Sequence, residues 1–149
     1  PVRQAEIEEF DIAHEREGHC CIEAEDPAAG NGRALKLFGH NFDWCGFVRG
    51  NAIKLDPGET YSIHVRVRVD KESEGNSFWA GVYDPVAKKD VVSVVKTTSE
   101  TSPDYRWYDI GTWQATGTEY FWIAPGRFDR GSHPAVKDVW LDKIEIRRK

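Results

Sequence analysis

The sequence predicts an all-β protein, a sandwich built from many short strands. Apolar and polar residues alternate over short segments, as in strands that bury one face. Gly, Pro, Asn and Asp residues separate these segments at short intervals, which indicates turns. No helix of useful length is apparent and nothing repeats at a fixed period. We therefore expect one β-sandwich domain over residues 1–149.

The segment of residues 61–69 is the clearest strand, because apolar side chains occupy every odd position and polar ones every even position. A Pro-Gly turn at residues 56–58 precedes it. In the last strand the apolar spacing shifts by one residue between Leu141 and Ile144, which predicts a β-bulge near Asp142 and Lys143. The expected strands are residues 5–12, 19–25, 34–38, 44–49, 52–55, 61–69, 77–83, 90–97, 105–113, 120–125 and 136–147.

The two aromatic segments at residues 105–113 and 120–125 are the most informative part of the chain. A Gly-containing turn separates them, so we expect them to pair as a hairpin. Side chains along a strand alternate between its faces, so only one set can enter the core. If Tyr108, Ile110, Phe121 and Ile123 point inward, a second set points outward together, namely Trp107, Asp109, Tyr120 and Trp122.

An outward row of rings beside a carboxylate suits the apolar faces and hydroxyl edges of a sugar. Aromatic side chains have two torsions, so stacking a sugar on them costs little ordering entropy, and soluble proteins rarely expose such a row without a use. Asp109, Arg106 and Asn76 would fix hydroxyl groups. The alternative is that several rings belong to the core. The expected carbohydrate-binding residues are Trp79, Tyr83, Trp107, Asp109, Tyr120 and Trp122.

A second possible site lies in the loops at one end of the sandwich, because loops carry function more often than cores do. The alternative is ordinary loop polarity with rings acting as lids. The residues concerned are Asp43, Trp44, Trp113, Arg127, Phe128 and Asp129.

The sequence lacks the familiar catalytic motifs, so it gives little support to an enzymatic function. The sequence has no Gly-x-Ser-x-Gly elbow, no phosphate-binding Gly loop and no His-Glu-x-x-His motif. His64, Arg66 and Arg68 share one strand face and could bind an acidic sugar or assist lyase chemistry, whereas a plain solvated face is the simpler interpretation. We expect a protein without catalytic activity, with a small polysaccharide lyase or hydrolase domain as the competing hypothesis.

The charge of the chain restricts the kinds of molecule that it can bind. The net charge is −5 and no basic tract is present, so neither nucleic acid nor an anionic membrane is expected as a partner. No apolar run reaches transmembrane length. Without an initiator Met or a visible signal peptide, the chain is expected to be a domain cut from a longer protein, and a monomer.

Cys45 could pair with Cys20 or Cys21, or the thiols could be buried and free.

Three segments resemble jelly-roll carbohydrate-binding modules of the xylan- and β-glucan-binding type, which are appended to secreted bacterial polysaccharide-degrading enzymes. They are EDPAAGNGRALKL at residues 25–37, PGETYSIHVRV at 57–67 and VWLDKIEI at 139–146. The resemblance implies a jelly roll of two antiparallel sheets, a polysaccharide or oligosaccharide ligand, a covalently linked catalytic domain and an extracellular or cell-surface location. The Cys20-Cys21 pair departs from the pattern. An accessory jelly roll that packs on a catalytic domain without binding sugar is the second alternative.

The resemblance also implies a structural Ca²⁺ between the first-strand region and an Asp of the last strand. Carried over, that residue is Asp142, with help from Glu6 or Glu8 and from Asp26 and Asn31 in the following loop. From chemistry alone, oxygen-rich strand ends suit Ca²⁺, and a charged solvated edge is the alternative.

Overall fold

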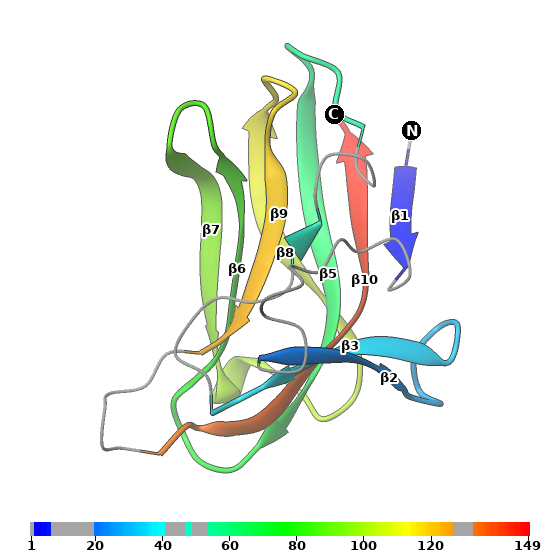
Figure 1. Cartoon of the computed structure of the whole chain (residues 1–149), viewed down its shortest axis with the longest axis vertical. Coiled ribbons are helices and arrows are strands. Elements are labelled where there is room, and N and C mark those ends of the chain that lie inside the picture. The colour runs from blue at the N-terminus through cyan, green and yellow to red at the C-terminus, as the bar shows by residue number, and fades with distance from the viewer. Residues whose placement is uncertain (1, 7–19, 41–46, 49–53, 127–132) are drawn as a thin grey trace.

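The computed structural model describes residues 2–6, 20–40, 47–48, 54–126 and 133–149, with the backbone alone at 2–6 and 47–48. Ten strands form two antiparallel sheets (Figure 1), which confirms the all-β prediction. The strands are β1 (Val2–Glu6), β2 (Cys21–Glu25), β3 (Arg33–Phe38), β4 (Phe47–Val48), β5 (Thr60–Lys71), β6 (Asn76–Asp84), β7 (Lys89–Thr97), β8 (Arg106–Gln114), β9 (Tyr120–Pro125) and β10 (Val136–Arg148). A 3₁₀ turn at Thr98–Glu100 follows β7. Within these ranges, no helix has the length and apolar character needed to cross a bilayer.

The larger sheet has six strands in the order β2-β3-β10-β5-β8, and β1 also pairs with β10. Strand β10 lies at the centre, since β5 lines one of its edges while β3 and then β1 line the other. The register between β10 and β5 shifts between Leu141 and Lys143, which confirms the predicted bulge. The smaller sheet has the order β4-β9-β6-β7.

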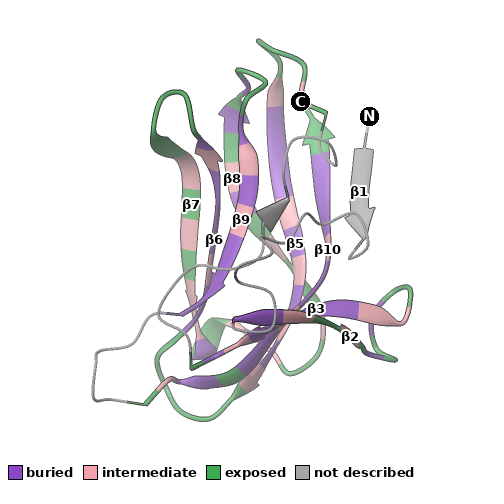
Figure 2. Ribbon diagram, viewed as in Figure 1, coloured by how far each residue is buried: buried purple, intermediate pink, exposed green. Residues whose placement is uncertain are grey.

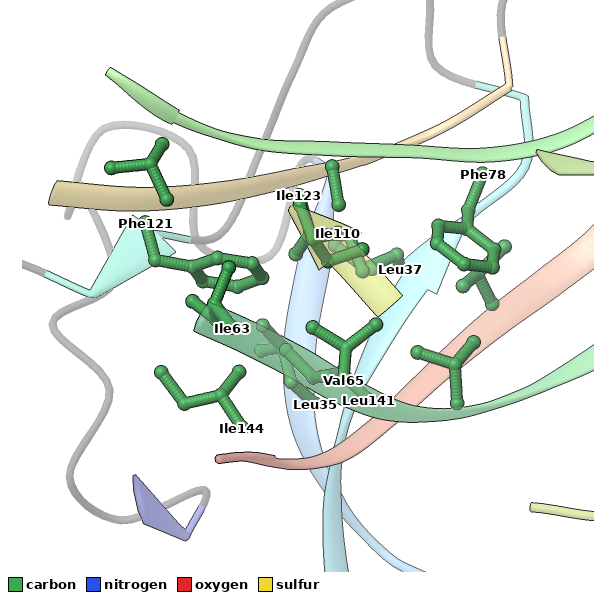
Figure 3. Close-up of a cluster of buried hydrophobic side chains, with 14 of the residues drawn as sticks. Leu35, Leu37, Ile63, Val65, Phe78, Ile110, Phe121, Ile123, Leu141 and Ile144 are labelled. Atoms are coloured by element: carbon green, nitrogen blue, oxygen red, sulfur yellow. The ribbon is translucent and has the colours of Figure 1, made fainter. Parts of the chain in front are cut away.

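The core lies between the two sheets (Figures 2 and 3). The odd-numbered side chains of residues 61–69 in β5 are buried, as their alternation predicts, with Ile63 and Val65 fully inaccessible. Phe78 and Phe121 face them from the smaller sheet, and both are essentially buried. Burial of each large side chain of this kind contributes roughly 1.5–3 kcal/mol to folding.

The predicted hairpin between residues 105–113 and 120–125 is wrong, because β8 and β9 belong to different sheets. Strand β8 pairs with β5, whereas β9 pairs with β6 and β4. The connection between them is organised by Glu119, whose carboxylate accepts the backbone N–H groups of Thr116 and Gly117 and the indole N–H of Trp113. Alternation correctly fixes which side chains point inward, but it leaves the pairing partner open.

Other sequence expectations differ at the ends of elements. The first strand is Val2–Glu6, so the expected residues 7–12 lie outside the described part of the chain. Residues 54 and 55 are not in a strand, in contrast to the strand expected at 52–55. Cys20 and Cys21 are both buried in the core, and Cys45 lies outside the described residues, so the predicted pairing stays a prediction.

Candidate functional site

Four of the expected rings lie on the outer face of the smaller sheet. Trp79 and Tyr83 come from β6, and Tyr120 and Trp122 come from β9. The ring centroids of Trp79 and Trp122 are 5.9 Å apart with the planes at 68°. Those of Tyr83 and Tyr120 are 5.5 Å apart at 53°. All four side chains are half-buried, and we call this set the aromatic platform.

The indole of Trp122 lies across the neighbouring strand. Gly81 is its cross-strand partner on β6, and a Cβ at Gly81 would come within 2.9 Å of Trp122 Cζ2. Beyond Gly81, Trp122 Nε1 donates a hydrogen bond of 2.8 Å to Asp90 Oδ1 on β7. The indole therefore extends from β9 over β6 to β7, in a fixed orientation that Gly81 makes room for.

Asp90 is a residue that the sequence analysis missed. Its contact with Trp122 spans 32 residues of sequence. The register between β6 and β7 also shifts next to Tyr83, so counting alternation from Tyr83 would not have located Asp90. Asp90 stands at the start of a predicted strand, and nothing else in the sequence marks it as a partner of Trp122.

Trp107 and Asp109 do not join the platform. Because β8 pairs with β5, they lie on the outer face of the larger sheet, opposite Arg66 and His64 respectively. The expected set of six therefore divides between opposite faces of the sandwich. Of the other polar neighbours expected there, Asn76 begins β6, whereas Arg106 begins β8.

Arg66 and Arg68 are engaged with carboxylates and rings on the larger sheet. Arg68 Nε lies 2.9 Å from Asp26 Oδ2, and its guanidinium lies 4.2 Å from the centroid of the Trp140 ring. Arg66 forms an ion pair with Asp142, and its guanidinium lies 4.9 Å from the ring centroid of Tyr105. The two arginines therefore form neither a plain solvated face nor a free basic pair that could bind an acidic sugar.

Asp26 is held as a carboxylate by its neighbours. Burial by itself would raise the pKa of Asp26, but hydrogen bonds from Tyr105 and Arg68 and from the Ala28 N–H outweigh it and lower the pKa. Burial and the hydrogen bond to Asp26 raise the pKa of the Tyr105 hydroxyl, which therefore stays protonated and donates.

The residues expected to bind Ca²⁺ occupy other contacts in the described structure. Asp142 is fully buried, accepts a 3.0 Å hydrogen bond from the Gly30 N–H and pairs with Arg66. Asn31 Oδ1 accepts the Arg33 N–H at 3.2 Å. Over the described ranges, no three His, Cys, Asp or Glu residues gather as a metal site would require. As placed, the carboxylates of Asp26 and Asp142 pair with the guanidinium groups of Arg68 and Arg66. The Glu6 side chain and Glu8 lie outside the described part.

Thermal unfolding tests the predicted calcium site against these contacts between protein groups. With Asp26 and Asp142 already neutralised, we expect Ca²⁺ in place of EDTA to change the melting temperature by less than about 2 °C. For a chain of this size that is less than about 1 kcal/mol of stability. Mg²⁺ at the same ionic strength serves as the control. A larger rise with Ca²⁺ alone would contradict this expectation and would support the predicted calcium site.

Of the six residues of the second possible site, in the loops at one end of the sandwich, the structure describes Trp113 alone. Trp113 is buried, and its Nε1 donates to Glu119 Oε2 at 2.8 Å, so it belongs to the core and is not a lid. The other five residues of that set, Asp43, Trp44, Arg127, Phe128 and Asp129, lie outside the described part. The sequence analysis also missed the buried carboxylates of Glu119 and Asp84, whose oxygens accept hydrogen bonds from nearby loop residues.

The sequence matches no protein-family model and no curated protein. Its fold, by contrast, is shared with solved structures. The CBM22-1 xylan-binding domain of Paenibacillus barcinonensis Xyn10C covers 99% of this chain and 94% of its own, at a TM-score of 0.61 and 12% identity. The chain has the jelly-roll fold of carbohydrate-binding modules.

Two further structures share the carbohydrate-binding-module fold. The CBM6 module of Cellvibrio mixtus lichenase 5A, in complex with cellotriose, covers 99% of this chain and 97% of its own, at a TM-score of 0.61 and 9% identity. The CBM22-1–GH10 modules of Clostridium thermocellum xylanase 10B, with xylohexaose, cover 97% of this chain at a TM-score of 0.62 and 14% identity. This chain spans 27% of that enzyme chain. At such identities the likeness establishes the fold, and the site must come from the geometry above.

Proposed function

We propose that the chain is a noncatalytic glycan-binding module that holds an attached enzyme close to its polysaccharide through the aromatic platform. The observation that carries this proposal is the gathering of Trp79, Tyr83, Tyr120 and Trp122 on one outer face, in two ring pairs. Flat rings of this kind bind the apolar faces of sugars with little loss of side-chain entropy.

The length of the platform favours a polymer over a single sugar. Trp79 and Tyr83 are four residues apart on β6, which places their Cα atoms about 13 Å apart at roughly 3.3 Å per residue. A chain that contacts both ring pairs must extend over several sugar rings. Few contacts on an open face give weak binding, and tethering to an enzyme would compensate by raising the effective concentration of the substrate.

The structural neighbours suggest the first ligands to test. They include a xylan-binding domain and complexes with cellotriose and xylohexaose, so neutral β-linked chains are suitable probes. We extend the proposal to a location outside the cell or at its surface, where such polymers occur, and to a monomeric module.

Lyase chemistry gains no support from the two arginines of the predicted basic face on β5. A lyase needs a basic group that can reach the substrate, whereas Arg66 and Arg68 are engaged by Asp142, Asp26 and Asp70. The interdomain hypothesis makes a distinct prediction, because an aromatic face made for a linked domain would promote self-association of the isolated chain.

Replacing Trp122 with alanine is expected to weaken polysaccharide binding about thirtyfold, or ~2 kcal/mol, as for a central aromatic anchor. Binding of the folded chain to a panel of plant, algal and microbial polysaccharides, followed by calorimetry, measures this. Trp122→Phe keeps a ring and should lose less. Val86→Ala removes an exposed apolar side chain from the β6–β7 turn and should lose nothing.

Two results would overturn the proposal. Wild-type protein that is folded but binds no polysaccharide of the panel would leave the platform without its ligand. Self-association that Trp122→Ala abolishes, measured by light scattering, would assign the platform to an interface instead.

A further inference from the structure

We propose that the outer face of the larger sheet carries a second subsite for neutral sugar, centred on Trp107, so that one module bridges two glycan chains. The inference rests on the proposed function for the class of its ligand. It adds a contact that is physically separate from the aromatic platform.

Trp107 is the most accessible Phe, Tyr or Trp residue of the described structure. Its exposure is 42%, and it is the only aromatic residue among the exposed large apolar side chains of the described ranges. Arg66, its cross-strand neighbour on β5, stacks on Tyr105 and pairs with Asp142 instead of covering the indole.

Polar groups that suit sugar hydroxyls lie next to this indole. Asp109 is two residues further along β8, on the same face, and its carboxylate is exposed. Across from it, His64 Nε2 lies 3.7 Å from Asp109 Oδ1. His64 Nδ1 is buried and has no hydrogen-bond partner among the described residues. A buried N–H without an acceptor is costly, so the proton is favoured on Nε2. A donor and an acceptor are thus paired beside an aromatic face.

The same surroundings argue against the other classes of ligand. A protein interface needs an apolar area of several hundred Å², whereas a single indole flanked by Asp109 and His64 offers far less. An acidic ligand needs unneutralised positive charge, and Arg66 is already paired with Asp142. A neutral sugar stacked on Trp107 needs neither.

Bridging follows from the placement of the two surfaces. The aromatic platform belongs to β6 and β9, whereas Trp107 belongs to β8 of the opposite sheet, and the two sheets enclose the core between them (Figure 1). Packed sheets lie about 10 Å apart, with outer side chains pointing away from each other. A straight sugar chain on one face cannot reach the other, so filling both sites joins two chains. Two weak sites together then raise retention on a dense polymer.

The experiment compares wild type with Trp107→Ala, Trp107→Phe and Trp122→Ala, using soluble xylan and mixed-linkage β-glucan together with short oligosaccharides of each. Turbidity with the long polymers reports bridging. Indole N–H resonances during oligosaccharide titration report contact at each tryptophan. Because Trp107 is exposed, its variants should keep the wild-type melting temperature.

We expect wild type to cross-link the polymer and Trp107→Ala to abolish the turbidity. The affinity of Trp107→Ala for oligosaccharides at the platform should differ from that of wild type by less than about twofold. Trp107→Phe should retain part of the turbidity. The inference is overturned if Trp107→Ala is as turbid as wild type, or if oligosaccharide moves the Trp122 resonance and leaves that of Trp107 unmoved. Absence of any response at either tryptophan would overturn the proposed function itself, and this inference with it.

Discussion

Replacing Glu119 with alanine is expected to lower the free energy of unfolding by about 4 kcal/mol. Glu119 is only 2% exposed. Its carboxylate accepts hydrogen bonds from the N–H groups of Thr116 and Gly117 and from the Trp113 indole. Each donor left without a partner costs roughly 1–3 kcal/mol where it is buried. Chemical denaturation of the variant measures the loss, and Glu72→Ala, at an exposed position, is the control.

The Glu119 carboxylate also gives the stability of the wild type a pH dependence of definite sign. Burial by itself would raise the pKa of Glu119, but the hydrogen bonds from the loop and from Trp113 outweigh it and lower the pKa below 4.5. The stabilisation is therefore complete above the unfolded pKa and is lost as the pH falls through the folded pKa. Wild type should lose more stability than Glu119→Gln between about pH 5 and pH 3. A loss below about 1 kcal/mol in Glu119→Ala at neutral pH would contradict the assigned role.

Replacing Asp142 with alanine is expected to lower the free energy of unfolding by about 3 kcal/mol. Removing one partner of a buried ion pair typically costs 3–5 kcal/mol, and we take the low end because Arg66 keeps some contact with water. The Gly30 N–H also loses its acceptor, so the loop of residues 26–32 should become more open to proteolysis.

A double-mutant cycle separates the ion pair from the rest of that loss. Replacing both partners by apolar groups is often nearly neutral, so Asp142→Leu combined with Arg66→Met should be less destabilising than the sum of the single changes. We expect a coupling of about 1–3 kcal/mol from denaturation of the four proteins. Additivity within about 0.5 kcal/mol would show that the two side chains do not stabilise each other.

The sequence was sufficient to predict features that depend on neighbouring residues. Alternation placed Ile110, Phe121 and Ile123 in the core, and the one-residue shift between Leu141 and Ile144 located the bulge in β10. Both follow from local geometry, because a strand buries every second side chain whichever strand it pairs with.

The features that were missed depend on distant parts of the chain. Arg66 meets Asp142 across 76 residues, and Trp122 meets Asp90 across 32. The incorrect hairpin has the same origin, since nothing local in the aromatic segments specifies whether the chain turns back or crosses to the other sheet. The four-ring platform emerged from the sequence because Tyr120 and Trp122 share a strand face, as do Trp79 and Tyr83. The separation of Trp107 and Asp109 from that platform could be recognised only from the strand pairing, because β8 pairs with β5 of the larger sheet.

The central position of β10 affects the order in which the protein can be assembled during synthesis. Strand β10 holds β1, β3 and β5 together, yet its residues are the last of the ten strands to leave the ribosome. Until then, β5 has an unpaired edge and β1 has no partner. Contacts between such distant segments form slowly, because the intervening chain must first be closed into a loop. The larger sheet can therefore be completed only after translation of residues 136–148, and its open edges require protection from other chains in the interval.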